Sequence, residues 1–303
     1  MRVLFVIPWE DFGGPHNLAI RMKRTLEKQQ VEIVVLLPEQ EGSAAARLEE
    51  FGVPVIKTRL QRLRNSFDPR IQLGFFAGFA SDVRAIKRII TELQIDLVQV
   101  FSLTNPHGAL AARAAKVPVV WQIGDLSPKP LRHLLMPMVR RFADVVMTTG
   151  RAIAHQHPGV IELRERLVVF FPPVDTELFC ADLGRRQAAR RELGFTDDEL
   201  VIGTVANVNR FKDTITFVRA AALVRKSFPK ARFIILGSTL RHLSSYTEAA
   251  WQEARSLGLR LGEELIQRNA GNRVADLAQA FDLFWLTSVS EGAPTALIEA
   301  MAL

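Results

Sequence analysis

Residues 288–302 read Ser-Val-Ser-Glu-Gly-Ala-Pro-Thr-Ala-Leu-Ile-Glu-Ala-Met-Ala, and this stretch decides the fold. The largely apolar run 282–286 precedes it and predicts a short strand, whereas Gly292 and Pro294 predict a tight turn. The apolar spacing that follows predicts a helix from about residue 293. A strand that passes through a tight turn into a helix is the repeating unit of a parallel sheet covered by helices.

The same alternation of short β-branched runs and longer helical patterns continues through the whole chain. We therefore predict an α/β protein built from two Rossmann-like domains, each a doubly wound parallel sheet with helices on both faces. Apolar residues at three-to-four spacing predict crossover helices at 18–26, 83–93, 214–225 and 246–257. The predicted strands are 3–7, 31–37, 53–56, 97–101, 117–123, 145–148, 167–171, 200–205, 231–236, a weak one near 265, and 282–286.

The composition of the sequence changes after residue 171. Pro172 and Pro173 end a strand there, and the polar, arginine-rich stretch 182–192 follows. Such a change indicates a domain boundary. We place it so that 1–172 forms an N-terminal Rossmann-like domain and 173–303 a C-terminal Rossmann-like domain. The chain ends inside a predicted apolar helix, whose face a following strand would normally cover. We therefore expect the second sheet to be incomplete and the natural sequence to continue.

Composition indicates a globular protein, with 48% hydrophobic and 23% charged residues among 303. No stretch approaches the roughly 18 unbroken apolar residues of a membrane span. The N-terminus reads as a first strand and lacks the length and cleavage site of a secretory signal. We expect a cytoplasmic protein. The single cysteine, Cys180, excludes an internal disulfide framework and any cysteine-cluster metal site.

A formal net charge of +7 suits anionic lipid, a phosphorylated substrate or nucleic acid. Basic residues are densest at 59–64 and 129–141, but neither stretch has the interleaved aromatic residues of a nucleic-acid surface, so we expect no nucleic-acid partner. The stretch 129–141 mixes cations with large apolar residues. It fits an interfacial helix in peripheral contact with an anionic membrane. A helix packed on the sheet with its arginines in water explains it equally well, and Pro137 limits its regularity.

In doubly wound domains, ligands bind beyond the carboxyl ends of the strands. The loop after the first predicted strand carries Gly13 and Gly14, which allow a close approach between backbone and ligand. The helix that follows offers free N–H groups to a phosphate or sugar oxygen. A flexible turn is the alternative. The loop lacks the G-x-G-x-x-G dinucleotide fingerprint, which disfavours a dehydrogenase.

Glu291 and Glu299 give a sharper signal because they flank the predicted strand-to-helix turn. Glu291 should lie at the carboxyl end of the strand, where the helix start points its unpaired N–H groups at the same space. An anionic diphosphate fits there. Glu299 lies one to two turns further on, where a carboxylate can accept two hydrogen bonds from vicinal hydroxyls such as those of a ribose. Two ordinary acidic residues on a helix are the alternative.

The run 291–302 resembles the E-x7-E signature of family 4 glycosyltransferases, which are metal-independent, retaining enzymes of the GT-B fold. Three other segments agree in order and spacing. The loop at 13–15 resembles the family's N-terminal glycine loop, 171–179 resembles its P-N-G-V-D-x-x-x-F segment, and 201–213 resembles its G-x-x-x-R-x-x-x-x-K-G phosphate-binding loop. Together they cover nearly the whole chain. The resemblance implies the GT-B fold, with two domains facing a cleft. It also implies that 1–172 is the acceptor-side domain and 173–303 the nucleotide-sugar-binding domain.

By this resemblance, Glu299 would hold the donor ribose, Glu291 would contact the transferred sugar and Lys212 would neutralise the diphosphate. A fixed ammonium and helix N-termini would stabilise the charge on the leaving oxygen without a metal, so we expect no cofactor and no metal. A solvated surface lysine is the alternative for Lys212. The expected catalytic residues are Glu291, Lys212 and Asp125. The expected donor-binding residues are Gly13, Gly14, Asn207, Arg210, Lys212, Glu291, Gly292, Ala293, Pro294, Thr295 and Glu299.

The chain departs from the family pattern at two positions. Asn207 stands where an arginine is common, although Arg210 lies close and could substitute, so we expect weaker or differently arranged diphosphate binding. Gly124 stands where many members have a histidine before the aspartate, here Asp125. His107, in a neighbouring loop, could enter the cleft in its place or simply be solvated.

The resemblance implies transfer of a sugar from a nucleoside-diphosphate sugar to a hydroxyl, with retention, in the synthesis of polysaccharide, lipopolysaccharide or glycolipid. The acceptor would be a saccharide or a lipid-linked molecule, and the enzyme would work in the cytoplasm or at the cytoplasmic membrane face. Two alternatives stay open: a nucleotide-sugar epimerase of GT-B fold, and a degenerate protein that binds a sugar nucleotide without turnover. We expect little activity from the 303-residue chain itself.

Overall fold

The structure of the chain is a computed structural model that describes residues 1–60, 69–239 and 244–303, without the side chains of residues 24 and 69–74. Part of the basic stretch 59–64 therefore lies outside the described residues. The chain forms two compact units, Met1–Pro173 and Val174–Leu303. The sequence places the division after residue 172, next to the observed one.

The first unit is built on a seven-stranded parallel sheet in the order β3-β2-β1-β4-β5-β6-β7. The order reverses direction between β1 and β4, which is the switch point where doubly wound domains bind ligands. In that region Val3 of β1 pairs with Ile33 on one side and with Leu97 on the other. The strands are β1 (Arg2–Val6), β2 (Glu32–Pro38), β3 (Val55–Thr58), β4 (Leu97–Phe101), β5 (Val119–Ile123), β6 (Val145–Thr149) and β7 (Leu167–Phe170).

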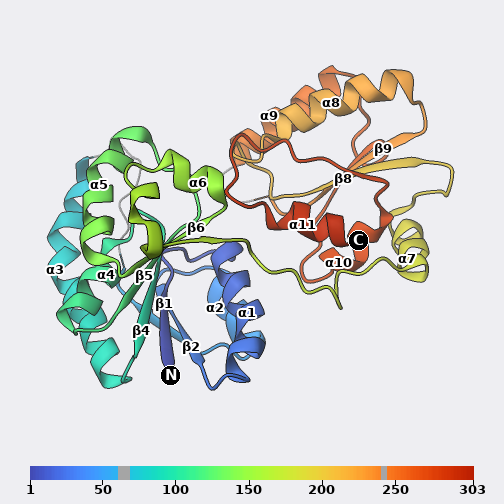
Figure 1. The fold of residues 1–303 in the computed structure, drawn as a ribbon. Coiled ribbons are helices and arrows are strands. Elements are labelled where there is room, and N and C mark those ends of the chain that lie inside the picture. Colours follow the sequence, from blue (N-terminus) through green and yellow to red (C-terminus); the bar gives the residue numbers. More distant parts are fainter. Residues whose placement is uncertain (61–68, 240–243) are drawn as a thin grey trace. The chain divides into compact units, whose positions relative to one another are not determined.

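Helices cover both faces of this sheet because successive side chains of a strand point to opposite faces. Val3 and Phe5 of β1 pack in the core under α1 and α2, whereas Leu4 and Val6 pack under α3, α4 and α5 (Figure 1). The helices are α1 (Gly14–Glu27), α2 (Ala44–Glu50), α3 (Pro69–Glu92), α4 (Pro106–Ala114), α5 (Lys129–Phe142) and α6 (Arg151–Gln156), with the 3-10 turn η1 (Ile161–Arg166).

The second unit repeats the architecture on a four-stranded parallel sheet in the order β10-β9-β8-β11. One core lies under α8 and α9 and a second under α7, α10 and η3 (Figure 1). The prediction of two doubly wound α/β units is confirmed. The elements are α7 (Leu183–Leu193), β8 (Leu200–Val205), α8 (Thr214–Ser227), β9 (Ala231–Leu236), α9 (Ser244–Ser256), β10 (Leu265–Arg268), α10 (Val274–Leu277), η3 (Ala278–Ala280), β11 (Leu283–Phe284) and α11 (Thr295–Ala302).

The arginine-rich stretch that marks the domain boundary in the sequence forms helix α7. Asp182 caps its start by accepting a hydrogen bond from the Arg185 N–H, and Gly194 ends it in the left-handed conformation, with a φ of 77°. Arg186 reaches Asp282, at the start of β11, over 2.5 Å. Only Ala189 and Leu193 of α7 pack in the core, and ion pairs across the unit add to this small apolar contact. The apolar spacing is therefore too sparse to reveal the helix.

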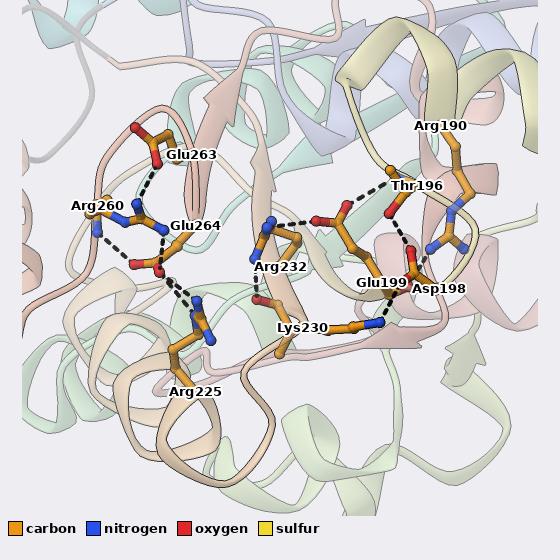
Figure 2. Close-up of polar contacts among 11 residues, drawn as sticks. Arg190, Thr196, Asp198, Glu199, Arg225, Lys230, Arg232, Arg260, Glu263 and Glu264 are labelled. Carbon is orange, nitrogen blue, oxygen red and sulfur yellow. Dashed lines mark hydrogen bonds and ion pairs between the residues drawn. The ribbon is translucent and has the colours of Figure 1, made fainter.

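A buried carboxylate joins α8 to the turn before β10. Glu264 is only 5% exposed and accepts hydrogen bonds from the Arg225 guanidinium (2.7 and 3.1 Å) and from the Arg260 guanidinium (2.9 Å), as Figure 2 shows. Burial alone would raise the pKa of the Glu264 carboxyl, but the hydrogen bonds from Arg260 and Arg225 outweigh it and lower that pKa to about 2. The ionised carboxylate is therefore part of the folded structure.

We expect Glu264→Gln to lower the free energy of unfolding by about 3 kcal/mol at pH 7, because it leaves two arginines facing a neutral amide. The matched control is Glu263→Gln, since the exposed Glu263 pairs with the same Arg260 at 2.9 Å and should contribute less than about 1 kcal/mol. Urea unfolding followed by circular dichroism measures both. Because the pKa of Glu264 is lowered, its contribution should fade as the pH falls below about 4.5. Equal losses in the two variants would contradict this account.

Candidate functional site

Lys212 and Glu291 meet in the second unit although 79 positions separate them along the chain. The Lys212 Nζ donates to the Glu291 Oε1 over 2.5 Å, and the two side chains stay 33% and 22% exposed. Lys212 lies in the loop 206–213 between β8 and α8, here the lysine loop. Glu291 lies in the loop 285–294 between β11 and α11, here the glutamate loop. Because β8 and β11 are paired parallel strands, both loops leave the same edge of the sheet.

The lysine loop and the glutamate loop are fastened to each other at two further points. The Val289 N–H donates to the Phe211 carbonyl oxygen over 2.9 Å, and the Thr287 hydroxyl donates to the Lys212 carbonyl oxygen over 2.9 Å. Both bonds end on backbone carbonyl groups of the lysine loop, at Phe211 and at Lys212 itself. The accessible ammonium and carboxylate therefore extend from backbones that are already held in place. Without these hydrogen bonds, forming the ion pair would cost more conformational entropy.

Asn207 binds the lysine loop to the loop that follows β9. Its Oδ1 accepts a hydrogen bond from the Ser238 N–H over 2.9 Å. The preceding Gly237 has to be glycine, because a Cβ there would lie 2.0 Å from the Ala206 carbonyl oxygen. The asparagine that stands at the arginine position thus uses its amide oxygen inside the protein. Arg210, the suggested substitute, is exposed.

Asp213 stands where the resembled loop pattern has glycine, and the structure gives the reason. Its backbone is left-handed, with φ 46° and ψ 59°, a conformation that glycine adopts readily and that aspartate tolerates. The Asp213 side chain also caps α8, accepting from the Thr216 N–H over 3.3 Å and from the Thr216 hydroxyl over 2.6 Å. The cap offsets the backbone strain at this position.

Helix α11 begins at Thr295, two residues later than the sequence predicts. Pro294 is the N-cap residue, and the residue before a proline is pushed away from the helical region, which keeps Ala293 outside the helix. The half-buried residues 292–295 therefore form the approach to the helix, close behind Glu291. Glu299 lies on the inner face of α11 and is 7% exposed.

The glycine loop of the first unit is held by a buried histidine that sequence reasoning missed. The His16 Nδ1 accepts from the Gly13 N–H over 3.0 Å, so its Nε2 carries the proton and donates to the Trp9 carbonyl oxygen over 3.1 Å. Burial lowers the pKa of His16 to about 4, which keeps this neutral tautomer in place. A Cβ at Gly13 or Gly14 would meet no atom within 4 Å.

The neighbouring loops of the first unit correct one expectation. His107 neither enters a ligand site nor is solvated: it lies in the first turn of α4, fully buried, with its ring 4.5 Å from that of Phe79 and 5.1 Å from that of Phe75. Burial lowers its pKa to about 4. Asp125 is exposed after β5. A Cβ at Gly124 would make only ordinary contact, 3.6 Å from the Thr149 hydroxyl.

The basic stretch 129–141 forms helix α5, and its apolar residues pack on the sheet. Leu135, Met136 and Val139 are buried in the core of the first unit, while Leu134 is 69% exposed. Arg140 and Arg141 are exposed, but Arg132 is buried, so not every arginine of the helix lies in water. The packed interpretation therefore accounts for most of its apolar residues. Among the described helices, none is both long enough and apolar enough to cross a bilayer. Within the same described residues, no group of three or more His, Cys, Asp or Glu side chains is arranged to hold a metal.

Two family models match complementary parts of the chain. The model described as Glycosyltransferase Family 4 matches residues 12–178, which is more than half of the 303 residues. The chain belongs to glycosyltransferase family 4. The model described as Glycosyl transferases group 1 matches residues 185–303, the part that carries the lysine loop and the glutamate loop.

Relatives of this family 4 glycosyltransferase are distant. It is 26% identical over 203 residues to a D-inositol 3-phosphate glycosyltransferase of Stackebrandtia nassauensis, a match that spans 65% of this chain and 45% of that relative. It is 22% identical over 311 residues to the UDP-Gal:alpha-D-GlcNAc-diphosphoundecaprenol alpha-1,3-galactosyltransferase of Escherichia coli, spanning 93% and 79%. The solved structure of Anabaena HepE in complex with UDP and glucose matches with a TM-score of 0.79 at 20% identity, covering 100% and 78%. That likeness supports the GT-B fold.

The motifs did not bring out three polar residues: His16, which holds the glycine loop of the first unit, and Asn209 and Thr287, which hold the lysine loop of the second unit. The sequence could have indicated Asn209, because an asparagine side chain in a loop tends to accept hydrogen bonds from backbone N–H groups two or three residues further on, which forms an Asx turn. Its Oδ1 accepts from the N–H groups of Phe211 and Lys212. The partner of Thr287 lies 75 positions away, so no local pattern could identify it.

We expect Asp213→Ala to lower the free energy of unfolding by about 2 kcal/mol, because alanine loses the cap and has no side-chain bond to offset the left-handed backbone. Asp213→Gly should cost only a few tenths of a kcal/mol, since it loses the cap but relieves the backbone. Asp213→Asn, which retains both features, is the matched control. Thermal unfolding ranks the three variants, and an alanine variant as stable as the glycine variant would refute the left-handed strain.

Acid should destabilise the first unit between about pH 6.5 and pH 4. The unfolded chain binds protons at His16 and His107 near pH 6.5, whereas the folded chain resists them until about pH 4, so stability falls as the pH is lowered through this window. The cost is up to about 3 kcal/mol for each histidine. His107→Leu should flatten the dependence of the unfolding free energy on pH, and the exposed His133→Leu should leave it unchanged. An identical slope in all three proteins would contradict the assignment.

Proposed function

We propose that this family 4 glycosyltransferase moves a hexose-type sugar from a nucleoside diphosphate to a hydroxyl, with retention at the anomeric carbon and without a metal. The observation that carries the proposal is the accessible Lys212 ammonium, held 2.5 Å from the Glu291 carboxylate beside the start of α11. A cation, a carboxylate and a helix N-terminus at one edge of a parallel sheet suit a sugar joined to pyrophosphate.

The charges of the site fit the electronic demand of this reaction. When the bond from the anomeric carbon to the diphosphate breaks, negative charge grows on the leaving oxygen. A fixed ammonium at Lys212 and the unpaired N–H groups at the start of α11 would stabilise that charge. The Lys212 ammonium pairs with Glu291, so a diphosphate would compete for Lys212 and release Glu291 to accept a hydrogen bond from a sugar hydroxyl.

The remaining predicted residues take subsidiary roles in the proposal. Glu299, buried on α11, would accept hydrogen bonds from the ribose hydroxyls. We propose that the donor binds on the second unit and the acceptor on the first. There the glycine loop, which a ligand atom can approach closely, and the exposed Asp125 would contact the sugars.

The names of the relatives suggest which substrates to test first. HepE was solved with UDP and glucose, and the galactosyltransferase of Escherichia coli is named for a UDP-linked donor and an acceptor on diphosphoundecaprenol. We propose a UDP-hexose donor and a lipid-linked saccharide acceptor in the synthesis of a cell-envelope polysaccharide. Peripheral contact with an anionic membrane would use the exposed cations and Leu134 of α5.

Donor binding and turnover test the proposal together. We expect calorimetry to show binding of a UDP-hexose, and NMR of the product to show the anomeric configuration of the donor. Lys212→Met should lower kcat about 100- to 1000-fold, because it removes the charge that stabilises the leaving group. Lys226→Met, at an exposed lysine in the last turn of α8, is the matched control and should leave kcat unchanged.

Three outcomes would contradict the proposal in different ways. Absence of nucleotide-sugar binding would remove its basis, and an inverted product would overturn retention. A requirement for a divalent cation, shown by loss of activity with a chelator, would overturn the metal-independent role of Lys212. Incubation without acceptor is the further control, because an epimerase would convert the donor sugar under that condition and a transferase would not.

A further inference from the structure

The main chain of Lys212 is held by side chains on both of its polar groups. Its N–H donates to the Asn209 Oδ1 over 2.9 Å, and its carbonyl oxygen accepts from the Thr287 hydroxyl over 2.9 Å. Lys212 precedes Asp213, the N-cap of α8, so helical hydrogen bonding does not fix its backbone. Two polar side chains, one from each loop, hold it instead.

Asn209 organises the lysine loop through three hydrogen bonds. Its Oδ1 accepts from the N–H groups of Phe211 and Lys212, both over 2.9 Å, and its Nδ2 donates to the Asn207 carbonyl oxygen over 3.1 Å. All three hydrogen bonds join the Asn209 amide to other residues of the lysine loop. The side chain thus closes the turn that directs Lys212 toward the glutamate loop.

Thr287 supplies the second anchor from the opposite loop. Among the described residues, two hydrogen bonds join the backbone of residues 211–212 to the glutamate loop. One runs from the Thr287 hydroxyl to the Lys212 carbonyl oxygen, and the other from the Val289 N–H to the Phe211 carbonyl oxygen. The bond from Thr287 therefore ends on Lys212 itself. The distance between the lysine backbone and the carboxylate of Glu291 therefore depends on a hydroxyl that touches neither charged group.

We propose that Asn209 and Thr287 are positioning residues, which hold the Lys212 ammonium where charge develops on the departing diphosphate. The inference rests on the proposed function and deepens it. A lysine side chain has four rotatable bonds and makes no planar fork, so its backbone has to be held in place to limit the positions that its ammonium can take. Catalysis by a fixed charge is sensitive to such placement, because an error of about 1 Å can cost about 100-fold in rate.

The most informative variants alter Thr287 or Asn209 and retain the charges of Lys212 and Glu291. Thr287→Val removes the hydroxyl while retaining the branched shape, and Thr287→Ser retains the hydroxyl as the matched control. Asn209→Ala removes all three hydrogen bonds, whereas Asn209→Ser retains an acceptor for the two N–H groups. We expect Thr287→Val and Asn209→Ala to lower kcat about 10- to 100-fold with little change in KM, because the lost stabilisation belongs to the transition state. Both serine variants should restore most of the rate.

A structural role alone would not reproduce one further result. In a Lys212→Met background, Thr287→Val should have no additional effect on kcat, since the group that it positions is gone. A drop of the same size in both backgrounds would overturn the proposal. So would a loss of stability in Thr287→Val with an unchanged kcat for the folded fraction.

A measurement that needs no turnover separates this inference from the proposed function. Reductive methylation with 13C-formaldehyde keeps lysines charged and gives each an NMR signal, and Lys212→Arg identifies the signal of Lys212. Thr287→Val and Asn209→Ala should move that signal toward those of exposed lysines, whereas Thr287→Ser should leave it in place. An unmoved signal in both variants would overturn the positioning role. An absence of UDP-hexose binding by the unaltered chain, with the signal moving as expected, would count against the proposed function only.

Discussion

The ion pair between Lys212 and Glu291 exists because two adjacent parallel strands release their loops at one edge of the second sheet. Neither residue is near the other in sequence, and neither charge is deeply buried, so the attraction between them is modest by itself. Its geometry comes from neutral groups, above all the Thr287 hydroxyl and the Asn209 amide. The charged pair thus depends on uncharged hydrogen bonds, which salt does not screen.

Close approach of backbones makes this arrangement sterically possible. Gly203 of β8 lies under the Phe281 ring, where a Cβ would come within 2.3 Å of ring carbon. Gly237 brings the loop after β9 against Ala206 of the lysine loop. Asn207 then ties these two loops together through the Ser238 N–H. The motif that this segment resembles has an arginine at the position of Asn207. Here the amide of Asn207 braces the lysine loop instead, and the positive charge rests on Lys212 and the exposed Arg210.

Two buried polar arrangements, one in each unit, respond differently to acid. The first unit buries His16 and His107 as neutral rings, so its stability should decline in mild acid. The second unit uses ionised pairs, such as Glu264 with Arg225 and Arg260, that survive to much lower pH (Figure 2). The helix α7 follows the same principle, since Arg186 and Asp282 hold it where apolar residues are scarce. Charge pairing in the second unit therefore supplements a modest core.

The sequence by itself determined the alternation of strands and helices, since side-chain period and turn residues are local properties; β4, β8 and β9 span the residues predicted for them. It also indicated Lys212 and Glu291 through spaced motifs. Only the tertiary structure decided that their side chains touch, that Thr287 anchors the lysine backbone, and that His107 is buried rather than open to a ligand. These outcomes depend on which loops the sheet brings together and on what packs above a ring, and no local pattern encodes such long-range proximity.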